Sequence, residues 1–580
     1  MAKKIFGWLV ILMLLASCTS TENIPTEAAP PTAVPPTEEP PALETAVPST
    51  NIPPTNTAAP PPTAIATAVP SEPDLSIEAD GVFLYPIPDV YAGDRVTFQV
   101  MAHVPANVDP NAVTVHILVN YQDVAEGTLS AINLAGDAVG LFEWAWDTTD
   151  EVGDQLVHII LDRFDTITEG DENRDNNQVA LTVPVLDPQT LPPNERNATW
   201  VSAETTCCNV YVVSGTAAYR DLPELLMTVE TAVTAAAASL EEPLNSKIDI
   251  YLIDRVIGQG GYAGNAIVVS YLDRHYASRG FEQILTHEAI HIIDRQFAPE
   301  RISFLAEGLA VWGTGGHYKS ENIHQRSAAL VALGQYVPLA DLIDNFYPVQ
   351  HEIGYLEAAG LVGYLIDTYG YPQFKRFYTD VTAEDAALMS QAIDLNLQQY
   401  FDITLTQAEA NWLAFLAEQP EDRTEQIDLQ TTIRYFNVMR RYQSLYDPTA
   451  YFLTAWLPYP GTLQTEGNPA DLTRHPQAEI NVTLEVMLQA SDAALRQGDY
   501  NKANVLLDSI TRVLDNDGTF IDPLAASYLA LVRSLTAQGY EVQAATLEGD
   551  RAQVQVTGRG TAVLTPLTLT LSGQNWILSN

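Results

Sequence analysis

The feature that most constrains this chain is the pentapeptide H-E-A-I-H at residues 287–291, which has the pattern H-E-x-x-H. Two histidines four residues apart project from one face of a helix, and neutral imidazole nitrogens are good zinc ligands. The glutamate beside the first histidine can reach a metal-bound water and accept its proton. No Gly or Pro occurs within 281–297, and the apolar residues there have helical spacing. The pattern predicts a helix carrying two metal ligands, His287 and His291, and a general base, Glu288.

A catalytic zinc usually has three protein ligands and one open position, so a third ligand is expected. A metzincin would need Gly and His three and six residues after His291, where this chain has Asp294 and Phe297. Glu307, in a predicted second helix, is the favoured candidate because a carboxylate among apolar residues is costly to bury unless it is paired or binds a metal. The alternatives are that Glu307 faces solvent or pairs with the nearby Arg301. A further alternative ligand is His317, in a Gly-rich loop.

Two later segments resemble the Peptidase MA-like family of gluzincin metallopeptidases. Residues 304–312 read F-L-A-E-G-L-A-V-W, and residues 354–370 read G-Y-L-E-A-A-G-L-V-G-Y-L-I-D-T-Y-G. The resemblance covers about 205–380. It implies one zinc ion per chain, bound by His287, His291 and Glu307, with Glu288 as the general base of peptide hydrolysis.

The resemblance also suggests roles for two further side chains. Tyr355 would donate a hydrogen bond to the oxyanion of the tetrahedral intermediate, although a tyrosine among apolar helix residues is also typical of a core. Asp294, one turn after His291, is either a partner that orients a histidine ring or a plain carboxylate at a helix end.

The G-x-M-E-N segment with which related aminopeptidases bind a free α-amine is absent from the sequence. This absence favours cleavage within peptide chains.

The N-terminus predicts a lipid anchor. Lys3 and Lys4 precede an apolar run, 5–16, that is too short for a mature transmembrane helix. The run ends in L-A-S-C, which resembles the lipobox of bacterial lipoproteins and implies lipidation of Cys18; the alternative is an ordinary signal peptide with a chance cysteine. Residues 18–73 hold more than a third of the 37 prolines and no Lys or Arg, which predicts a disordered stalk. We therefore expect 1–17 to be a signal peptide and the mature chain to be tethered by lipid to the outer face of a bacterial membrane, in an extracytoplasmic location.

Residues 74–187 predict an all-β sandwich of the immunoglobulin type. Alternating apolar and polar residues mark strands at 95–100, 113–119, 140–146, 156–161 and 178–183. The segment resembles the CARDB-type adhesion modules of bacterial surface proteins in D-L at 74–75, A-G-D at 92–94 and the acidic loop 169–177. This resemblance implies a cell-surface protein or polysaccharide as partner. The acidic loop either binds calcium or forms a turn held by Asx hydrogen bonds; the turn is favoured because the sixth and twelfth positions lack the Gly and Glu of an EF-hand.

Residues 198–420 predict an α+β metallopeptidase domain of the zincin type, after a Pro-containing linker at 188–197. The expected order is strand, helix, strand, Gly-rich loop, strand and then the metal-motif helix. The last strand, 264–270, would run along the cleft as an edge strand and pair with an extended peptide. The adjacent Cys207 and Cys208 would form either a strained vicinal disulfide or two thiols on opposite faces of a strand.

The rest of the chain predicts a helical connector at 421–475 and a small α+β accessory domain at 476–580. Helices are expected at 427–446, 478–513 and 521–537, the last two resembling a helical hairpin, and four strands follow between 541 and 578. No chemistry can be assigned to this part.

The net charge of the chain restricts the classes of partner that it can bind. The chain has 28 basic and 73 acidic residues and a net charge of −45, which argues against nucleic acid because that partner requires clustered Lys and Arg. Two hypotheses remain. The first is a lipid-anchored, extracytoplasmic zinc endopeptidase acting on protein or peptide substrates. The second is a surface binding or adhesion lipoprotein with a structural or inactive metal site.

Overall fold

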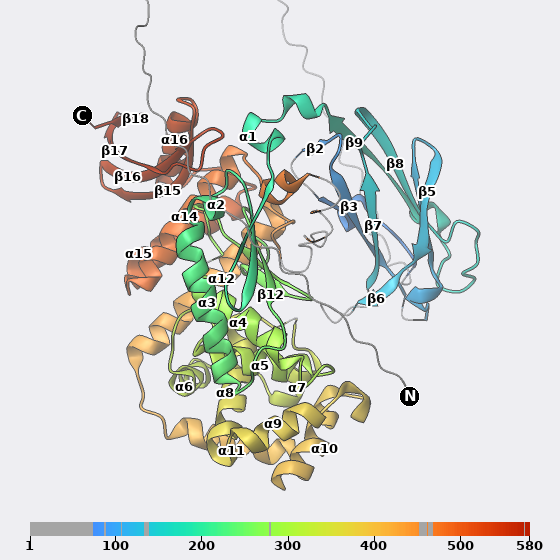
Figure 1. The fold of residues 1–580 in the computed structure, drawn as a ribbon, viewed down its shortest axis with the longest axis vertical. Coiled ribbons are helices and arrows are strands. Elements are labelled where there is room, and N and C mark those ends of the chain that lie inside the picture. The colour runs from blue at the N-terminus through green and yellow to red at the C-terminus, as the bar shows by residue number, and fades with distance from the viewer. Residues whose placement is uncertain are drawn as a thin grey trace, which may run out of the picture. The chain divides into compact units, whose positions relative to one another are not determined.

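The computed structural model describes residues 74–85, 89–105, 107–132, 139–277, 280–347, 349–451, 461, 464, 468–573 and 575–579 (Figure 1). The described residues belong to one compact unit, Pro70–Asn580. The predicted signal peptide, the lipidation site Cys18 and the stalk 18–73 lie outside the described residues. Among the helices described, none is long and apolar enough to cross a membrane.

The first part consists of two β-sheets whose buried faces share one hydrophobic core. Alternate residues Val96, Phe98 and Val100 of one sheet pack against residues such as Ile117 and Ile159 of the other. All five predicted strands are present. In the first sheet, the strand order is β1 (Val82–Tyr85), β3 (Arg95–His103), β7 (Val139–Asp147), β6 (Ser130–Ile132). In the second sheet, the strand order is β2 (Val90–Tyr91), β9 (Gln178–Leu186), β8 (Gly153–Leu161), β4 (Thr114–Val119), β5 (Gln122–Thr128). The immunoglobulin-type assignment stays a prediction.

The acidic loop 169–177 is held by its own polar side chains. Both carboxylate oxygens of Asp171 accept hydrogen bonds from the Asn177 amide at 2.9 Å, and Asn173 caps the short 3-10 turn that follows it. The guanidinium of Arg174 lies 3.6 Å from Asp171. These contacts are those of a turn stabilised by Asx hydrogen bonds, and a cation within the loop would have to compete with Arg174.

The second part is built on a mixed sheet with the order β10 (Trp200–Glu204), β11 (Cys208–Val213), β12 (Ile248–Ile253), β14 (Ile267–Ser270), β13 (Gly261–Ala263). Strands β11, β12 and β14 are parallel, and β10 and β13 pair antiparallel at the two edges. Residues such as Val210, Ile250 and Val269 belong to one core with residues of α3 (Leu222–Ser239) and α4 (Phe281–Asp294).

The prediction that 264–270 forms the edge strand is wrong. Strand β14 lies inside the sheet, and the edge is β13, within the stretch predicted to be a flexible Gly-rich loop. Gly260 has a φ of 113°, which a residue with a Cβ rarely adopts, and this turn sends 261–263 back along β14. The glycines therefore build the edge strand rather than interrupt it.

The adjacent cysteines are two buried thiols, not a disulfide. Cys207 precedes β11, and a hydrogen bond from the Cys208 thiol lowers its pKa. Only Cys208 belongs to the strand, and both cysteines join the same buried core, so the expectation of two thiols on opposite faces of a strand is wrong.

A layer of helices follows α4 and makes up the second half of the stretch 198–420. Its helices are α5 (Ser303–Thr314), α6 (Ile323–Ala332), α7 (Leu339–Asp344), α8 (His351–Tyr369), α9 (Tyr371–Asp380), α10 (Met389–Phe401) and α11 (Leu405–Ala417). Helix α8 is buried from His351 to Gly363 and packs closely on α5. It is the central helix of this layer.

The C-terminal part confirms the predicted strands and the helices expected at 427–446 and 521–537, whereas the stretch 478–513, expected as one helix, forms two helices separated at Gly498, which has a φ of 75°. Helices α12 (Arg423–Tyr446), α14 (Glu479–Arg496), α15 (Tyr500–Asp515) and α16 (Pro523–Thr536) precede an antiparallel sheet of β15 (Tyr540–Glu548), β16 (Arg551–Gly558), β17 (Thr565–Ser572) and β18 (Asn575–Leu578). The buried Arg274, just after β14, donates to Glu485 of α14 at 2.6 Å and to the carbonyl of Val542. This part therefore shares a buried ion pair with the region that carries H-E-x-x-H. The domain boundaries stay predictions.

One buried carboxyl group in α8 leads to a prediction about stability. Glu357 is fully buried; one of its oxygens accepts a hydrogen bond from the Val337 amide at 2.9 Å, and the other has no partner among the described residues. Burial, with a contribution from the Glu409 carboxylate, raises the pKa of Glu357 to about 8. The folded protein thus holds a proton that the unfolded chain loses above about pH 4.3. Stability attributable to this group falls as the pH rises from there towards 8.

Replacing Glu357 by Gln should remove that pH dependence. The amide keeps the acceptor for Val337 and carries no charge, so the variant should be stabilised at pH 8 by about 3 to 4 kcal/mol more than at pH 5. Thermal or urea unfolding at the two pH values measures the difference. The matched control is Glu384→Gln, at an exposed position. Equal effects of Glu357→Gln at pH 5 and pH 8 would contradict the prediction.

Candidate metal centre

The two histidines of H-E-x-x-H lie on α4, as predicted, and both are buried. Their ring centroids are 4.8 Å apart, with the rings nearly perpendicular. Glu288 lies between them in sequence and is only 4% exposed. Residues Ile290 and Ile293 hold α4 against the core, which leaves the histidine face of the helix directed at a cavity.

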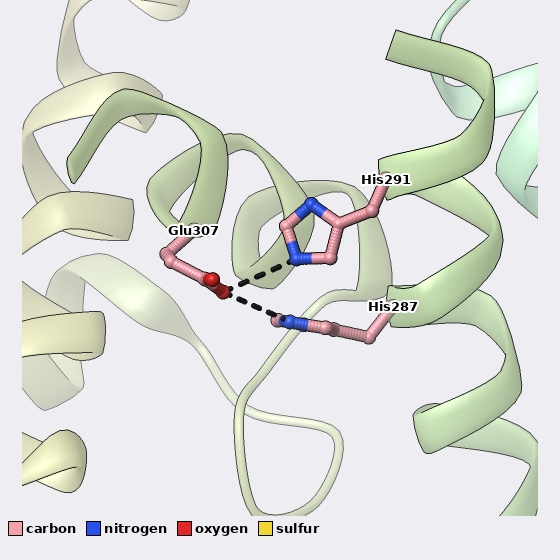
Figure 2. Close-up of side chains that lie close together, drawn as sticks. All are labelled: His287, His291 and Glu307. Carbon is pink, nitrogen blue, oxygen red and sulfur yellow. Dashed lines mark hydrogen bonds and ion pairs between the residues drawn. The ribbon is translucent and has the colours of Figure 1, made fainter. Parts of the chain in front are cut away.

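Glu307 of α5 meets both histidines. Its Oε2 lies 3.1 Å from Nε2 of His287 and 3.2 Å from Nε2 of His291. Figure 2 shows the carboxylate between the two imidazole rings, with the histidines on one helix and the glutamate on its neighbour. The alternative that Glu307 pairs with Arg301 is wrong, because Arg301 pairs with Asp294 at 2.8 Å.

This donor set fits a zinc ion. The three ligand atoms lie within 4.8 Å of one another, and no other such group of His, Cys, Asp and Glu occurs among the described residues. Zinc binds imidazole nitrogen and carboxylate oxygen at about 2.0–2.2 Å, which places tetrahedral ligand atoms a little over 3 Å apart. The two contacts of Glu307 Oε2, at 3.1 and 3.2 Å, are close to that spacing.

The electrostatics also favour a cation. Burial alone would raise the pKa of Glu307, but the charges of His291 and His287 and their hydrogen bonds hold it well below its ordinary value. Burial lowers the pKa of His291, whereas Glu307, Asp294 and Glu288 together raise it to about 10. Positive charge is therefore stabilised between these residues, whether it comes from protons or from a metal ion.

Gly308 explains how α5 brings Glu307 to this position. A Cβ at residue 308 would lie 2.7 Å from the carbonyl oxygen of Ala358 and 2.9 Å from a methyl group of Val362. The backbones of α5 and α8 approach so closely that only glycine fits. The glycine of the A-E-G segment thus sets the position of the helix that carries the third candidate ligand.

Replacing Gly308 by Val should therefore push α5 away from α8. Overpacking of this kind costs about 1–3 kcal/mol, and because Glu307 is the preceding residue, we also expect weaker metal binding. Thermal unfolding and a zinc titration measure the two effects. Gly334→Val is unsuitable as a control because residue 334 has a φ of 68°. Gly264→Val, where a Cβ meets nothing within 4 Å, is the matched control, and equal effects of the two variants would refute this role of Gly308.

A cavity of about 500 Å³ opens over the candidate centre. His287, Glu288, His291 and Glu307 line it, and strand β13 forms part of its wall. The cavity therefore presents three candidate ligands, one further carboxylate and an edge strand to the same space.

Asp294 and Tyr355 both lie near the centre. Asp294 is fully buried; Tyr378 donates to it at 2.6 Å, and its carboxylate is 4.0 Å from Nδ1 of His291. Tyr355 lines the cavity, and its ring is nearly parallel to that of His287, with 6.4 Å between centroids. The roles assigned to both residues stay predictions.

His317 lies outside the group of candidate ligands. It is buried in the loop after α5, and its Nδ1 contacts the carboxylate of Glu352. Its ring centroid is 6.5 Å from that of His287. Its hydrogen-bonding partner is thus a carboxylate of α8.

Three residues in the cavity wall were missed by sequence reasoning. His351 precedes Tyr355 by one turn of α8, and its Nδ1 contacts the amide of Gln259 from the Gly-rich stretch. Arg295 follows α4. The spacing of His351 from Tyr355 was a usable signal, because residues at i and i+4 share a helix face. Arg295, four residues after His291, carried the same kind of signal, whereas Gln259 carried none.

Comparisons with known proteins give only weak structural likenesses. No protein-family model matches the sequence, and no curated protein matches it either. Among solved structures, a CARDB domain from Pyrococcus furiosus is 18% identical to this chain. The match covers 20% of this chain and 94% of the CARDB domain, with a TM-score of 0.16.

Two further solved structures are similar over a longer stretch. An M1 zinc metallopeptidase from Deinococcus radiodurans is 11% identical to this chain. The match covers 59% of this chain and 93% of the metallopeptidase chain, with a TM-score of 0.27. Yeast LTA4 hydrolase in complex with bestatin is 10% identical to this chain. The match covers 80% of this chain and 98% of the hydrolase chain, with a TM-score of 0.30. These scores are too low to carry a functional assignment, which has to rest on the side chains of the site.

Proposed function

We propose that the protein is a zinc-dependent peptidase that hydrolyses peptide bonds within chains and is anchored by lipid on Cys18 outside the bacterial cytoplasm. One observation supports the chemistry above all others. A single carboxylate oxygen of Glu307 lies 3.1 and 3.2 Å from the Nε2 atoms of His287 and His291, beside the buried Glu288. A purely structural site would need no additional carboxylate in the same cavity.

The residues have distinct tasks in this proposal. His287, His291 and Glu307 hold one zinc ion, which when bound polarises a carbonyl and increases the acidity of water. Glu288 accepts a proton from the attacking water and delivers it to the leaving amine. Tyr355 donates a hydrogen bond to the developing oxyanion, and Asp294 helps to orient His291.

The edge strand supplies a place for the substrate backbone. Among the described strands, β13 pairs with β14 alone, and its residues line the same cavity as Glu288. An extended peptide would add to this edge by main-chain hydrogen bonds, which do not depend on peptide sequence. The absence of G-x-M-E-N supports cleavage within chains.

The N-terminal parts would position the enzyme. The lipobox at Cys18 and the Pro-rich stretch 18–73 support a tether that holds the catalytic part away from the membrane. In this proposal the β-sandwich is an immunoglobulin-type, CARDB-like module that binds a cell-surface protein or polysaccharide.

The test combines metal analysis with proteolysis. Purified protein should contain one zinc per chain and cleave an unfolded protein such as reduced, alkylated casein. A chelator should abolish cleavage, and zinc should restore it. Protein that holds stoichiometric zinc but cleaves neither casein nor a mixed peptide library would overturn the proposal and favour a surface-binding lipoprotein with a structural metal.

A further inference from the structure

Arg295 is a cationic side chain in the wall of the candidate active-site cavity. It follows the last residue of α4, four residues after His291. Its guanidinium donates to the carbonyl oxygen of Gly264 at 2.7 Å and to that of Ala263 at 2.8 Å. These carbonyls belong to the last residue of the edge strand and to the residue after it, so Arg295 is fixed where an extended substrate would pass.

The charge of Arg295 is not neutralised by a carboxylate. Among the described residues, no Asp or Glu forms an ion pair with it, whereas its neighbour Arg301 pairs with the buried Asp294. In a chain with a net charge of −45, such an arginine beside the centre is unusual. Burial and the charge of Arg301 lower its pKa, so the site stabilises this cation less well than water does.

The lining of the cavity adds to the positive potential once a metal is bound. Its charged residues are two carboxylates, Glu288 and Glu307, and two guanidiniums, Arg295 and Arg301. A divalent cation would leave this set with an excess of positive charge. Glu307 would be coordinated and Glu288 would be engaged with water, so neither is available to neutralise Arg295.

We propose that Arg295 determines substrate specificity by binding a carboxylate of the peptide, and that the enzyme prefers substrates with an acidic group next to the scissile bond. This inference rests on the proposed peptidase function. A guanidinium has five N–H donors in a planar fork, and Arg295 uses only some of them on the two carbonyls. The remaining donors can form charge-assisted hydrogen bonds, which are shorter and about twice as strong as neutral ones.

The competing explanation is that Arg295 only ties α4 to the edge strand. A brace of that kind would affect all substrates equally when removed. A specificity residue would affect anionic substrates selectively. The ratio between matched substrates therefore separates the two roles, whereas overall activity does not.

The test uses fluorescent peptides that are identical except for one residue beside the cleavable bond, which is Glu, Gln or Lys. Both ends are blocked to remove terminal charges. A fourth peptide carries Gln and a free C-terminal carboxylate, which separates a side-chain carboxylate from a chain end as the recognised group. Cleavage is measured with the wild type, and binding is measured by anisotropy with zinc-loaded Glu288→Gln protein. Each measurement is repeated with Arg295→Gln, Arg295→Lys and, as a control of equal charge change, the exposed Arg551→Gln.

We expect the Glu peptide, or the peptide with a free C-terminus, to be cleaved and bound about tenfold or more better than the blocked Gln peptide. Arg295→Gln should abolish this ratio, Arg295→Lys should retain part of it, and Arg551→Gln should leave it unchanged. Equal values for the Glu, Gln, Lys and free-terminus peptides, or an equal loss for all of them in Arg295→Gln, would overturn the inference. If no peptide is cleaved, the proposed peptidase function fails, and the anisotropy ratios still decide the role of Arg295.

Discussion

Replacing Glu288 by Gln is expected to lower peptide hydrolysis by about 10²–10⁴-fold while leaving the zinc content unchanged. The amide has the size and acceptor oxygen of the carboxylate, but it cannot take a proton from water. Glu288 does not belong to the group of candidate ligands His287, His291 and Glu307, so the metal should remain. Steady-state cleavage of a quenched peptide and metal analysis of the same preparation measure both quantities.

The control for this substitution lies on the same helix. Glu282→Gln changes an exposed glutamate in the first turn of α4 and should leave hydrolysis within about twofold, because most exposed substitutions have small effects. If Glu288→Gln keeps more than a tenth of wild-type activity, the general base is another group. If the variant loses zinc, Glu288 is itself involved in binding the metal.

Elements with strong local patterns could be predicted from the sequence. The C-terminal strands alternate apolar and polar residues, and the predicted and observed segments around Trp576 and Leu569 agree. Helix α4 was predictable because its apolar residues follow helical spacing without Gly or Pro. In these elements, local propensity and tertiary packing favour the same structure, which is when sequence reasoning works well.

The edge of the central sheet could not be predicted because its strand depends on backbone conformation. Strand β13 has three residues in a stretch with four glycines, a composition typical of a loop. It becomes a strand because Gly260 adopts a positive φ and because β14 offers a free side for pairing. Neither condition is visible in the pattern of side chains.

The residues of the candidate site also fall into two groups, those whose position the sequence predicts and those whose position it does not. The two histidines are placed by helix geometry alone, since residues at i and i+4 share a face. That Glu307 meets them depends on the crossing of α5 over α4 and α8, which the sequence shows only indirectly through Gly308. Gln259 reaches the cavity through a contact between separate segments, which spacing in the chain could not show, whereas His351 and Arg295 lie one helical turn from Tyr355 and His291, a spacing that could have indicated them.

Removing the carboxylate of Glu307 is expected to weaken zinc binding by more than about 100-fold. Changing groups that merely support a ligand typically costs 10–100-fold in affinity, so losing a ligand atom should cost more. In the Glu307→Ala variant, two imidazoles would remain, and the positive charge between them would lose the carboxylate that stabilises it. Competition with a chromophoric chelator measures the affinity of each protein.

Thermal unfolding gives an independent measurement of the same loss. A ligand present at 100 times its Kd stabilises the folded state by about 2.7 kcal/mol, so wild-type protein should melt at a higher temperature with zinc than with a chelator. Glu307→Ala should show no such difference at the same zinc concentration, and Glu300→Ala, at an exposed position before α5, should behave like the wild type. If Glu307→Ala binds zinc with unchanged affinity, Glu307 is not a ligand. The contact of its Oε2 with both Nε2 atoms would then be a hydrogen bond to a protonated histidine pair, and the third ligand would have to come from another residue around the cavity.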